Sequence, residues 1–195
     1  MLPKLIRAAS HASHALACQA RLAWFNATCF VFYRALPLST TIYGRIRLLH
    51  RPCRLKVGRR CRIGDDVYFA TTLTSTIEWG DNVTVNMGCV FVAIDRIEIG
   101  DNTAIAEYVS FRDQAHLTVE GHGVREQGYK VAPIKVGRNV WIGRGVYVGA
   151  GAVIGDDCIV GANSVVHGQF PAGSMIAGAP ATTRRNLYQQ SSAAE

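Results

Sequence analysis

The chain has 195 residues, of which 49% are hydrophobic and 18% charged, so it suits one folded domain with an appendage and excludes a mainly disordered state. The net charge of +7 is uneven, because residues 1–62 hold twelve Lys and Arg and no Asp or Glu, whereas the rest holds nine basic and fourteen acidic residues. The two parts are therefore expected to meet different surroundings.

Residues 1–52 are predicted to form a basic, helical N-terminal segment. Apolar residues recur at helical spacing between residues 15 and 36, and the uncharged run there is too short to span a bilayer. Two roles stay open: an interfacial helix that contacts an anionic membrane, or a cap over the first coil of the next domain with a solvated basic face. The basic residues also permit nucleic-acid binding, but no recognised motif accompanies them, so no nucleic-acid partner is expected.

Residues 53–170 carry an apolar residue at every sixth position. The pattern is clearest where an aliphatic residue precedes glycine: Val136-Gly137, Ile142-Gly143, Val148-Gly149, Ile154-Gly155 and Val160-Gly161. A period of six suits neither a helix nor an exposed strand, but it suits a coil with three short strands that turn at glycines. Fifteen such positions form five groups of three: Val57, Ile63, Phe69; Trp79, Val85, Phe91; Ile99, Ile105, Phe111; Val136, Ile142, Val148; Ile154, Val160, Val166. The sequence therefore predicts an all-β fold, a parallel β-helix of about five triangular coils.

The spacing of six is interrupted after Phe69, after Phe91 and after Phe111, and each time it resumes at the first member of a new group. All three insertions are therefore expected to leave from one corner of the prism. The longest, residues 112–133, is predicted to project as an arm, which is typical of a functional loop. The phenylalanines are expected to stack in the core. Residues 171–195 are expected to form a C-terminal tail.

The cysteines favour a reducing compartment. Cys61, Cys89 and Cys158 each follow a repeat aliphatic residue by four places, where the repeat takes a small side chain, so we expect them to be buried. No CxxC pair occurs, so the sequence predicts neither a zinc knuckle nor a redox motif, and it favours the cytoplasm.

Three segments resemble the sugar O-acetyltransferase group of the hexapeptide-repeat acyltransferase superfamily, which includes galactoside and maltose acetyltransferases and enzymes that decorate bacterial surface polysaccharides. The segments are Ser110–His116 (SFRDQAH), Ala132–Gly143 (APIKVGRNVWIG) and Ile176–Ala181 (IAGAPA) with the arginines that follow. The resemblance implies a left-handed β-helix, a homotrimer with sites between subunits, acetyl-CoA as co-substrate and no metal. It also implies a role in polysaccharide biosynthesis.

His116 is the candidate general base. A hydroxyl is a weak nucleophile at neutral pH, and histidine has a suitable pKa to activate it. His116 begins the arm, and in the resembling enzymes the histidine at this place is the base. Asp113, three residues earlier, is expected either to orient the ring or to face water. His122 and His167 are the competing histidines.

Asn86 is the second candidate catalytic residue. It stands at a corner where most coils have glycine, so it either tolerates a left-handed backbone or, as the resemblance implies, reaches the acceptor or the reacting centre. The resemblance also implies acetyl-CoA along the side of the prism, with these contacts: Trp141, Gly143, Ala162, Ser164, Pro180, Arg184 and Arg185. Thr182 departs from the pattern, because the galactoside and maltose enzymes carry arginine there.

The predicted function is acetyl transfer from acetyl-CoA to a saccharide hydroxyl. A lipid-linked or surface polysaccharide intermediate at the inner face of the membrane is the expected acceptor, reached by peripheral contact through the basic segment. One alternative is an N-acetyltransferase of an amino sugar nucleotide. Another is a metalloenzyme like γ-type carbonic anhydrase, which needs three convergent imidazoles, whereas only His116 and His122 lie in neighbouring positions.

Overall fold

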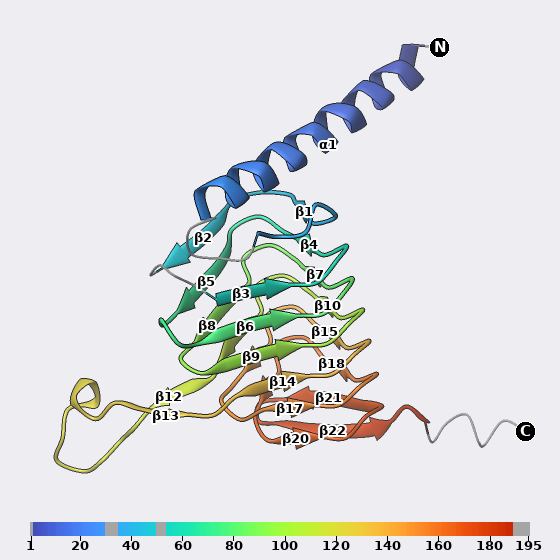
Figure 1. Cartoon of the computed structure of the whole chain (residues 1–195). Coiled ribbons are helices and arrows are strands. Elements are labelled where there is room, and N and C mark those ends of the chain that lie inside the picture. The colour runs from blue at the N-terminus through green and yellow to red at the C-terminus, as the bar shows by residue number, and fades with distance from the viewer. Residues whose placement is uncertain (1, 30–34, 50–53, 189–195) are drawn as a thin grey trace, which may run out of the picture.

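The computed structural model describes residues 2–29, 35–49 and 54–188, and in them the chain forms a long helix followed by a column of short strands (Figure 1). The helix, α1 (Leu2–Cys29), lies across one end of the column. The strands wind through three sheets, and each turn of the chain contributes one strand to each sheet. The fold is therefore a parallel β-solenoid, which confirms the prediction.

Each sheet takes every third strand of the winding. The first sheet contains β1 (Thr41–Ile42), β4 (Arg62–Ile63), β7 (Thr84–Val85), β10 (Ala104–Ile105), β15 (Trp141–Ile142), β18 (Ile159–Val160), β21 (Ser174–Gly178) and β22 (Ala181–Asn186). The second contains β2 (Ile46–Leu49), β5 (Val67–Thr71), β8 (Val90–Ala93), β11 (Ser110–Arg112), β16 (Tyr147–Val148) and β19 (Val165–Val166). The third contains β3 (Arg54–Val57), β6 (Thr76–Trp79), β9 (Arg96–Ile99), β14 (Ile134–Val136), β17 (Val153–Ile154) and β20 (Gln169–Phe170).

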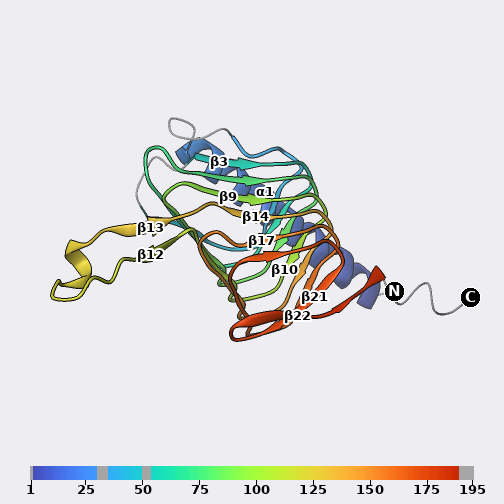
Figure 2. The ribbon, with the colours of Figure 1, turned by 90° about the horizontal axis from the view of Figure 1, so that it is seen from below.

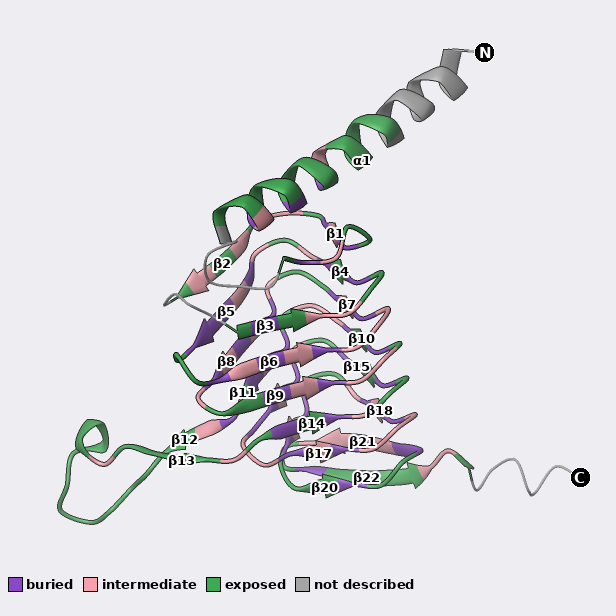
Figure 3. Ribbon diagram, in the orientation of Figure 1, coloured by how far each residue is buried: buried purple, intermediate pink, exposed green. Residues whose placement is uncertain are grey.

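The core fills the inside of the column (Figure 3). Of the fifteen predicted core positions, fourteen are buried and Val57 is half-buried. The aromatic rings stack as expected, with Phe91 in register between Phe69 (centroids 5.3 Å apart) and Phe111 (4.8 Å apart). Trp79 packs at a tilt against Phe69 and Phe91. The spacing of six therefore produces a continuous apolar core.

The described residues form about six turns rather than five. The solenoid begins at β1, where Ile42 and Leu48 face inward six residues apart, but the spacing then breaks before Leu55. At the other end, Phe170 extends the winding beyond the aliphatic-glycine pattern. Both terminal turns have irregular repeats, so the sequence pattern underestimates the length. The left-handed winding stays a prediction.

The helix α1 covers the first turn, which is one of the two roles that the sequence leaves open. Cys18, Leu22 and Phe25 lie on one face of α1 at helical spacing and are buried. The Asn26 side chain accepts a hydrogen bond from the backbone N–H of Leu36 (2.8 Å) and donates one to its carbonyl (3.0 Å). These contacts fix the end of α1 to the chain that enters the solenoid.

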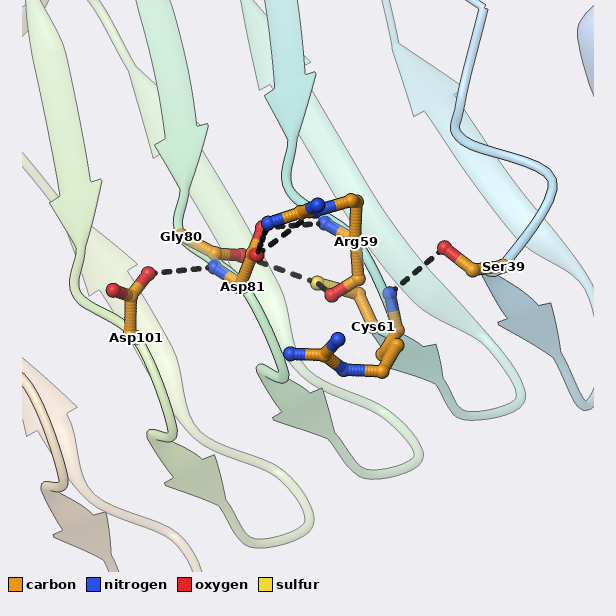
Figure 4. A network of polar contacts seen from close by, with 7 residues as sticks. Ser39, Arg59, Cys61, Gly80, Asp81 and Asp101 are labelled. Carbon is orange, nitrogen blue, oxygen red and sulfur yellow. Dashed lines mark hydrogen bonds and ion pairs between the residues drawn. The ribbon is translucent and has the colours of Figure 1, made fainter.

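Glycine and aspartate stack at the corner that leads from the third sheet to the first (Figure 4). The Asp81 carboxylate accepts a hydrogen bond from the backbone N–H of Arg59 (2.8 Å), and the Asp101 carboxylate accepts one from the backbone N–H of Asp81 (2.7 Å). A Cβ at Gly80 would lie 2.1 Å from Asp101 Oδ1, so only glycine fits there. Cys61 donates its thiol to the Gly80 carbonyl (3.3 Å). Successive turns are thus joined through backbone groups at this corner.

Burial of the three repeat cysteines is confirmed. Each has an exposed fraction of 0% and forms no disulfide: Cys61, Cys89 and Cys158. Burial raises the pKa of the Cys89 thiol to about 11. These side chains therefore act as small core residues.

The corner between the first and second sheets contains one unusual residue, Tyr108. Its φ is +60°, whereas the same place in other turns is held by Asp66, Gly88, Gly145 or Asn163. A bulky residue in the left-handed region is strained, and asparagine tolerates this region better. The substitution Tyr108→Asn is therefore expected to raise the free energy of unfolding by about 1 kcal/mol, measured by urea denaturation.

A matched control is Tyr147→Asn, because Tyr147 lies on β16 without a positive φ. That substitution is expected to give no gain. A loss of stability in Tyr108→Asn would show that the contacts of the Tyr108 ring with Gly88 and Arg144 outweigh the backbone strain.

Candidate functional site

The arm is a hairpin that leaves the solenoid after β11 and returns before β14 (Figure 2). Its strands β12 (Gln114–His116) and β13 (Tyr129–Val131) pair antiparallel, and a short 3-10 helix, η1 (Val124–Glu126), lies near its tip. Gln127 organises the tip, since its side-chain amide donates to the His122 carbonyl (2.8 Å). The arm therefore has internal structure and projects from the solenoid (Figures 1 and 2), as the sequence predicts.

Asp113 holds the base of the arm. Its side chain is 0% exposed, and its carboxylate accepts hydrogen bonds from the backbone N–H groups of Ile94 (2.8 Å), Asp95 (2.7 Å) and Arg96 (2.9 Å). Burial raises the pKa of Asp113, while these backbone donors favour its charged form and oppose the rise. The expectation that Asp113 orients the histidine ring or faces water is therefore wrong, because the carboxylate is buried and its three donors lie in the loop before β9 and at the first residue of β9.

His116 ends β12 and is exposed. It is in register with Tyr129, and the centroids of the two rings are 4.5 Å apart with an interplanar angle of 46°. The ring of His116 therefore packs against a neighbour within the arm while staying open to solvent. Of the competitors, His122 is exposed in the turn of the arm, and His167 packs against Tyr147 with centroids 5.7 Å apart.

Asn86 is exposed at the corner that follows β7. It does not have a positive φ; the left-handed place in that turn belongs to Gly88. The backbone N–H of Asn86 donates to the Ile105 carbonyl (2.9 Å), which fixes the main chain and leaves the side chain outside. Tolerance of a left-handed backbone therefore does not account for Asn86. Within the described part of one chain, no hydrogen bond joins Asn86 to His116.

The residues predicted to contact CoA gather along the same corner, in the turns that follow Asn86. A Cβ at Gly143 would lie 2.7 Å from the backbone nitrogen of Ala162, so these two residues lie against each other. Trp141 is 57% exposed and is in register with Ile159 of the next turn. The result is a strip of surface along this corner, called the edge below, which carries the small residues Gly143 and Ala162 and has the exposed Trp141 indole beside it.

The tail continues this edge. The Ser164 hydroxyl is buried, donates to the Gly161 carbonyl (2.6 Å) and accepts from the backbone N–H of Gly178 (3.2 Å). Arg184 lies on β22 and donates to the Ala177 carbonyl (3.1 Å), while Pro180 is exposed in the turn between β21 and β22. The exposed Arg185 is in register with Met175. Two arginines therefore stand at the end of the edge.

A strap holds the tail in place. The Tyr188 hydroxyl donates to the Asp157 carboxylate, which lowers the pKa of Asp157 and raises the pKa of Tyr188 to about 12. Because the pKa of Asp157 is lower in the folded protein, the ionised carboxylate stabilises the fold at pH values above the ordinary aspartate pKa. This stability is lost as the pH falls through the lowered pKa. The raised phenol pKa contributes stability below about 10 that is lost as pH rises from there to about 12.

The substitution Tyr188→Phe is expected to lower the melting temperature at neutral pH, because the hydrogen bond to Asp157 is removed. The difference from the wild type should vanish at pH values below the lowered pKa of Asp157 and above about 12. Melting curves of both proteins across pH measure this. A difference that does not change with pH would mean that the strap acts through packing of the ring on Gly173.

Within the described part of the chain, no three His, Cys, Asp or Glu side chains gather in a way that could hold a metal ion. No helix in that part is long and apolar enough to cross a membrane.

Comparisons with known proteins agree with the repeat and the fold. Residues 133–168 match the bacterial transferase hexapeptide family (six repeats), and residues 54–92 match the hexapeptide repeat of succinyl-transferase. The chain is 29% identical over 163 residues to the putative lipopolysaccharide biosynthesis O-acetyl transferase WbbJ of Escherichia coli, covering 76% of this chain and 83% of that protein. It is 35% identical over 136 residues to the galactoside O-acetyltransferase of Escherichia coli, covering 67% of this chain and 63% of that protein.

A probable acetyltransferase of Mycobacterium tuberculosis is 32% identical over 148 residues, which are 73% of this chain and 48% of that protein. The chain therefore spans only part of the length of some curated relatives. Among solved structures, a galactoside acetyltransferase in complex with coenzyme A has a TM-score of 0.60 at 24% identity, covering 92% of this chain and 86% of that one. AntD, an N-acyltransferase from Bacillus cereus solved with dTDP and coenzyme A, has a TM-score of 0.64 at 16% identity, covering 79% and 86%. These structures share the fold.

Proposed function

Because the chain belongs to the hexapeptide-repeat superfamily of acyltransferases, we propose that it transfers an acetyl group from acetyl-CoA to a hydroxyl of a saccharide. The observation that carries the proposal is the exposed His116 on a structured arm whose base is fixed by the buried Asp113. An imidazole held outside the solenoid can approach a substrate that lies on a neighbouring subunit. As the family resemblance implies, the functional unit we propose is a homotrimer with sites between subunits.

His116 takes the proton of the acceptor hydroxyl as the oxygen attacks the acyl carbon, and it later gives that proton to the departing sulfur. Acetyl-CoA, when bound, supplies the acetyl group as a thioester. The Asn86 amide, exposed at the corner, donates a hydrogen bond to the acceptor or to the developing oxyanion, a contribution of about 3 kcal/mol in such sites. No covalent intermediate with the protein is needed.

The edge from Trp141 to the tail fits a CoA molecule. The small residues Gly143 and Ala162 let an extended pantetheine chain approach the backbone, and Trp141 flanks it. The arginines at the end of the edge, Arg184 and Arg185, suit phosphate groups. Because the Ser164 hydroxyl is engaged inside the protein, we assign it a structural part in shaping this edge. Similar structures that were solved with coenzyme A support CoA as the ligand.

The acceptor is a lipid-linked or surface polysaccharide intermediate on the cytoplasmic side of a membrane. The basic residues before position 63, with no acid among them, support peripheral contact of the chain with that surface. The similarity to a putative lipopolysaccharide biosynthesis O-acetyl transferase supports an acceptor of this class.

The test is release of free thiol from acetyl-CoA by the purified full-length protein. Glycosides that carry only hydroxyl groups and an amino sugar nucleotide are offered in parallel, and the position of the acetyl group is read by NMR. Transfer to oxygen supports the proposal. Transfer only to the amine would establish the N-acetyltransferase alternative, and absence of transfer to both would refute an acetyl-CoA-dependent transferase of sugars.

A further inference from the structure

The outer face of α1 is exposed to solvent (Figure 3), although most of its side chains are apolar. At helical spacing it presents six exposed alanine, leucine and tryptophan side chains, with Ser13 as a polar residue among them: Ala12, Leu16, Ala20, Ala23, Trp24 and Ala27. Leu16 is 73% exposed and Trp24 is 74% exposed. The opposite face is the buried stripe around Leu22 that covers the first turn. A helix that is apolar on both faces is expected to be covered on both, so the outer face needs an occupant.

A pocket of about 530 Å³ lies next to this face, between α1 and the first turn. Trp24 and Phe25 line it from the helix, and Ile46 and Leu48 line it from β2. Arg21 and Arg45 lie at the same pocket. The pocket therefore combines an apolar wall with two cationic groups, as an amphiphile with an anionic headgroup requires.

The cations at the pocket are available for such a headgroup. Arg21 forms no ion pair with a carboxylate within the described residues, and Arg45 approaches Asp66 only at 3.9 Å with its side chain 70% exposed. Asp65 also lines the pocket; its carboxylate accepts the backbone N–H of Arg45 (2.6 Å), and this bond, together with the nearby charges of Arg45 and Arg21, lowers the pKa of Asp65. Two arginines face one aspartate, so the pocket keeps an excess of positive charge for a headgroup.

Charge selects among the possible occupants of the outer face. The first 62 residues carry twelve basic and no acidic residues, so a second copy of this segment would be repelled, whereas an anionic surface would be attracted. Apolar side chains on a basic helix are typical of helices that lie in the interface of a bilayer.

We propose that α1 and the first turn form a membrane-docking surface, in which Leu16 and Trp24 enter the bilayer interface and the pocket between Arg21 and Arg45 takes the headgroup of an anionic phospholipid. This deepens the membrane contact proposed above and does not depend on acyl transfer. The helix lies on the membrane, and the solenoid stands on its cytoplasmic side.

Sedimentation of the full-length protein with vesicles tests the proposal. We expect binding to vesicles of phosphatidylcholine with phosphatidylglycerol, weaker binding to phosphatidylcholine alone, and a decrease with salt. The double substitution Leu16→Ser with Trp24→Ser should weaken binding at least about tenfold, because two side chains no longer leave water. Arg21→Gln with Arg45→Gln should weaken binding to the anionic vesicles by a similar factor.

Matched controls lie outside α1 and the first turn. Leu73→Ser removes an equally exposed leucine in the loop between β5 and β6, and Arg125→Gln removes an exposed arginine of η1, so both should bind vesicles as the wild type does. Melting temperature and oligomeric mass are recorded for every variant, together with acetyl transfer to a water-soluble acceptor. Lost vesicle binding with retained transfer supports this inference alone.

Three results would overturn the inference: no preference of the wild type for anionic vesicles, unchanged binding of the Leu16 and Trp24 double variant, or a change of oligomeric mass in that variant in place of lost binding. The last would mean that a second copy covers the face. None of these results concerns acetyl transfer, which is measured separately.

Discussion

Replacing His116 by alanine is expected to leave a folded protein whose turnover is at least about a hundredfold slower than that of the wild type. The side chain is exposed, and its ring contact is with Tyr129 inside the arm, so its removal leaves the solenoid core untouched. The loss arises because no other group takes the proton of the acceptor hydroxyl. Thiol release from acetyl-CoA in the presence of a saccharide acceptor measures turnover, and circular dichroism with mass determination verifies the assembly.

The matched control is His122→Ala, an exposed histidine in the turn of the same arm. It is expected to keep turnover within about twofold of the wild type, since surface substitutions usually have small effects. Full activity in the His116 variant would remove this residue from the mechanism. Equal losses in both variants would instead mean that the arm responds to any change of its side chains.

Removing the Asp113 carboxylate is expected to cost about 3 kcal/mol of unfolding free energy, since Asp113→Ala leaves the backbone N–H groups of Ile94, Asp95 and Arg96 without their acceptor. The same change frees the base of the arm. Because His116 follows three residues later, we expect the turnover number to fall about tenfold or more while the KM for acetyl-CoA stays constant. Urea denaturation at fixed protein concentration and steady-state kinetics measure the two effects.

Two further variants separate positioning from general damage. Asp95→Ala removes an exposed carboxylate from the same loop and should change neither quantity. Asp113→Asn keeps one acceptor oxygen, so it should lie between alanine and the wild type in stability and in turnover. A variant that is destabilised as predicted but turns over at the rate of the wild type would show that the anchor does not position His116.

The regular part of the fold could be predicted from the sequence because apolar residues recur at a spacing of six, and many of them are followed by glycine at the corner. The stack of Phe69, Phe91 and Phe111 follows directly from the shared register of their turns. The first turn could not be predicted, because its spacing of six is broken before Leu55. Its strands are instead held in place by pairing with the strands of the second turn, which sequence periodicity does not detect.

The residues of the candidate site could be identified one by one from the sequence, but their arrangement relative to one another could not. The resemblance singles out His116 and Asn86, and the structure places both on the surface without bringing them together in one chain. The role of Asp113 was missed, because its three donors lie seventeen to nineteen residues earlier and adjoin it only once the turns are stacked. The position of Tyr108 in a place otherwise held by Gly, Asn or Asp was a signal in the sequence that a comparison of corner residues could have found.

The two ends of the column also determine how far it can grow. A parallel solenoid exposes unpaired strand edges at its first and last turns, and such edges invite addition of further chains. In this protein α1 lies over one end, and β22 folds back antiparallel onto β21 at the other, so the first sheet ends on a strand of opposite direction. A further parallel coil cannot continue the first sheet in register beyond β22, so stacking of solenoids end to end is disfavoured at this sheet by the reversed strand rather than by the repeats.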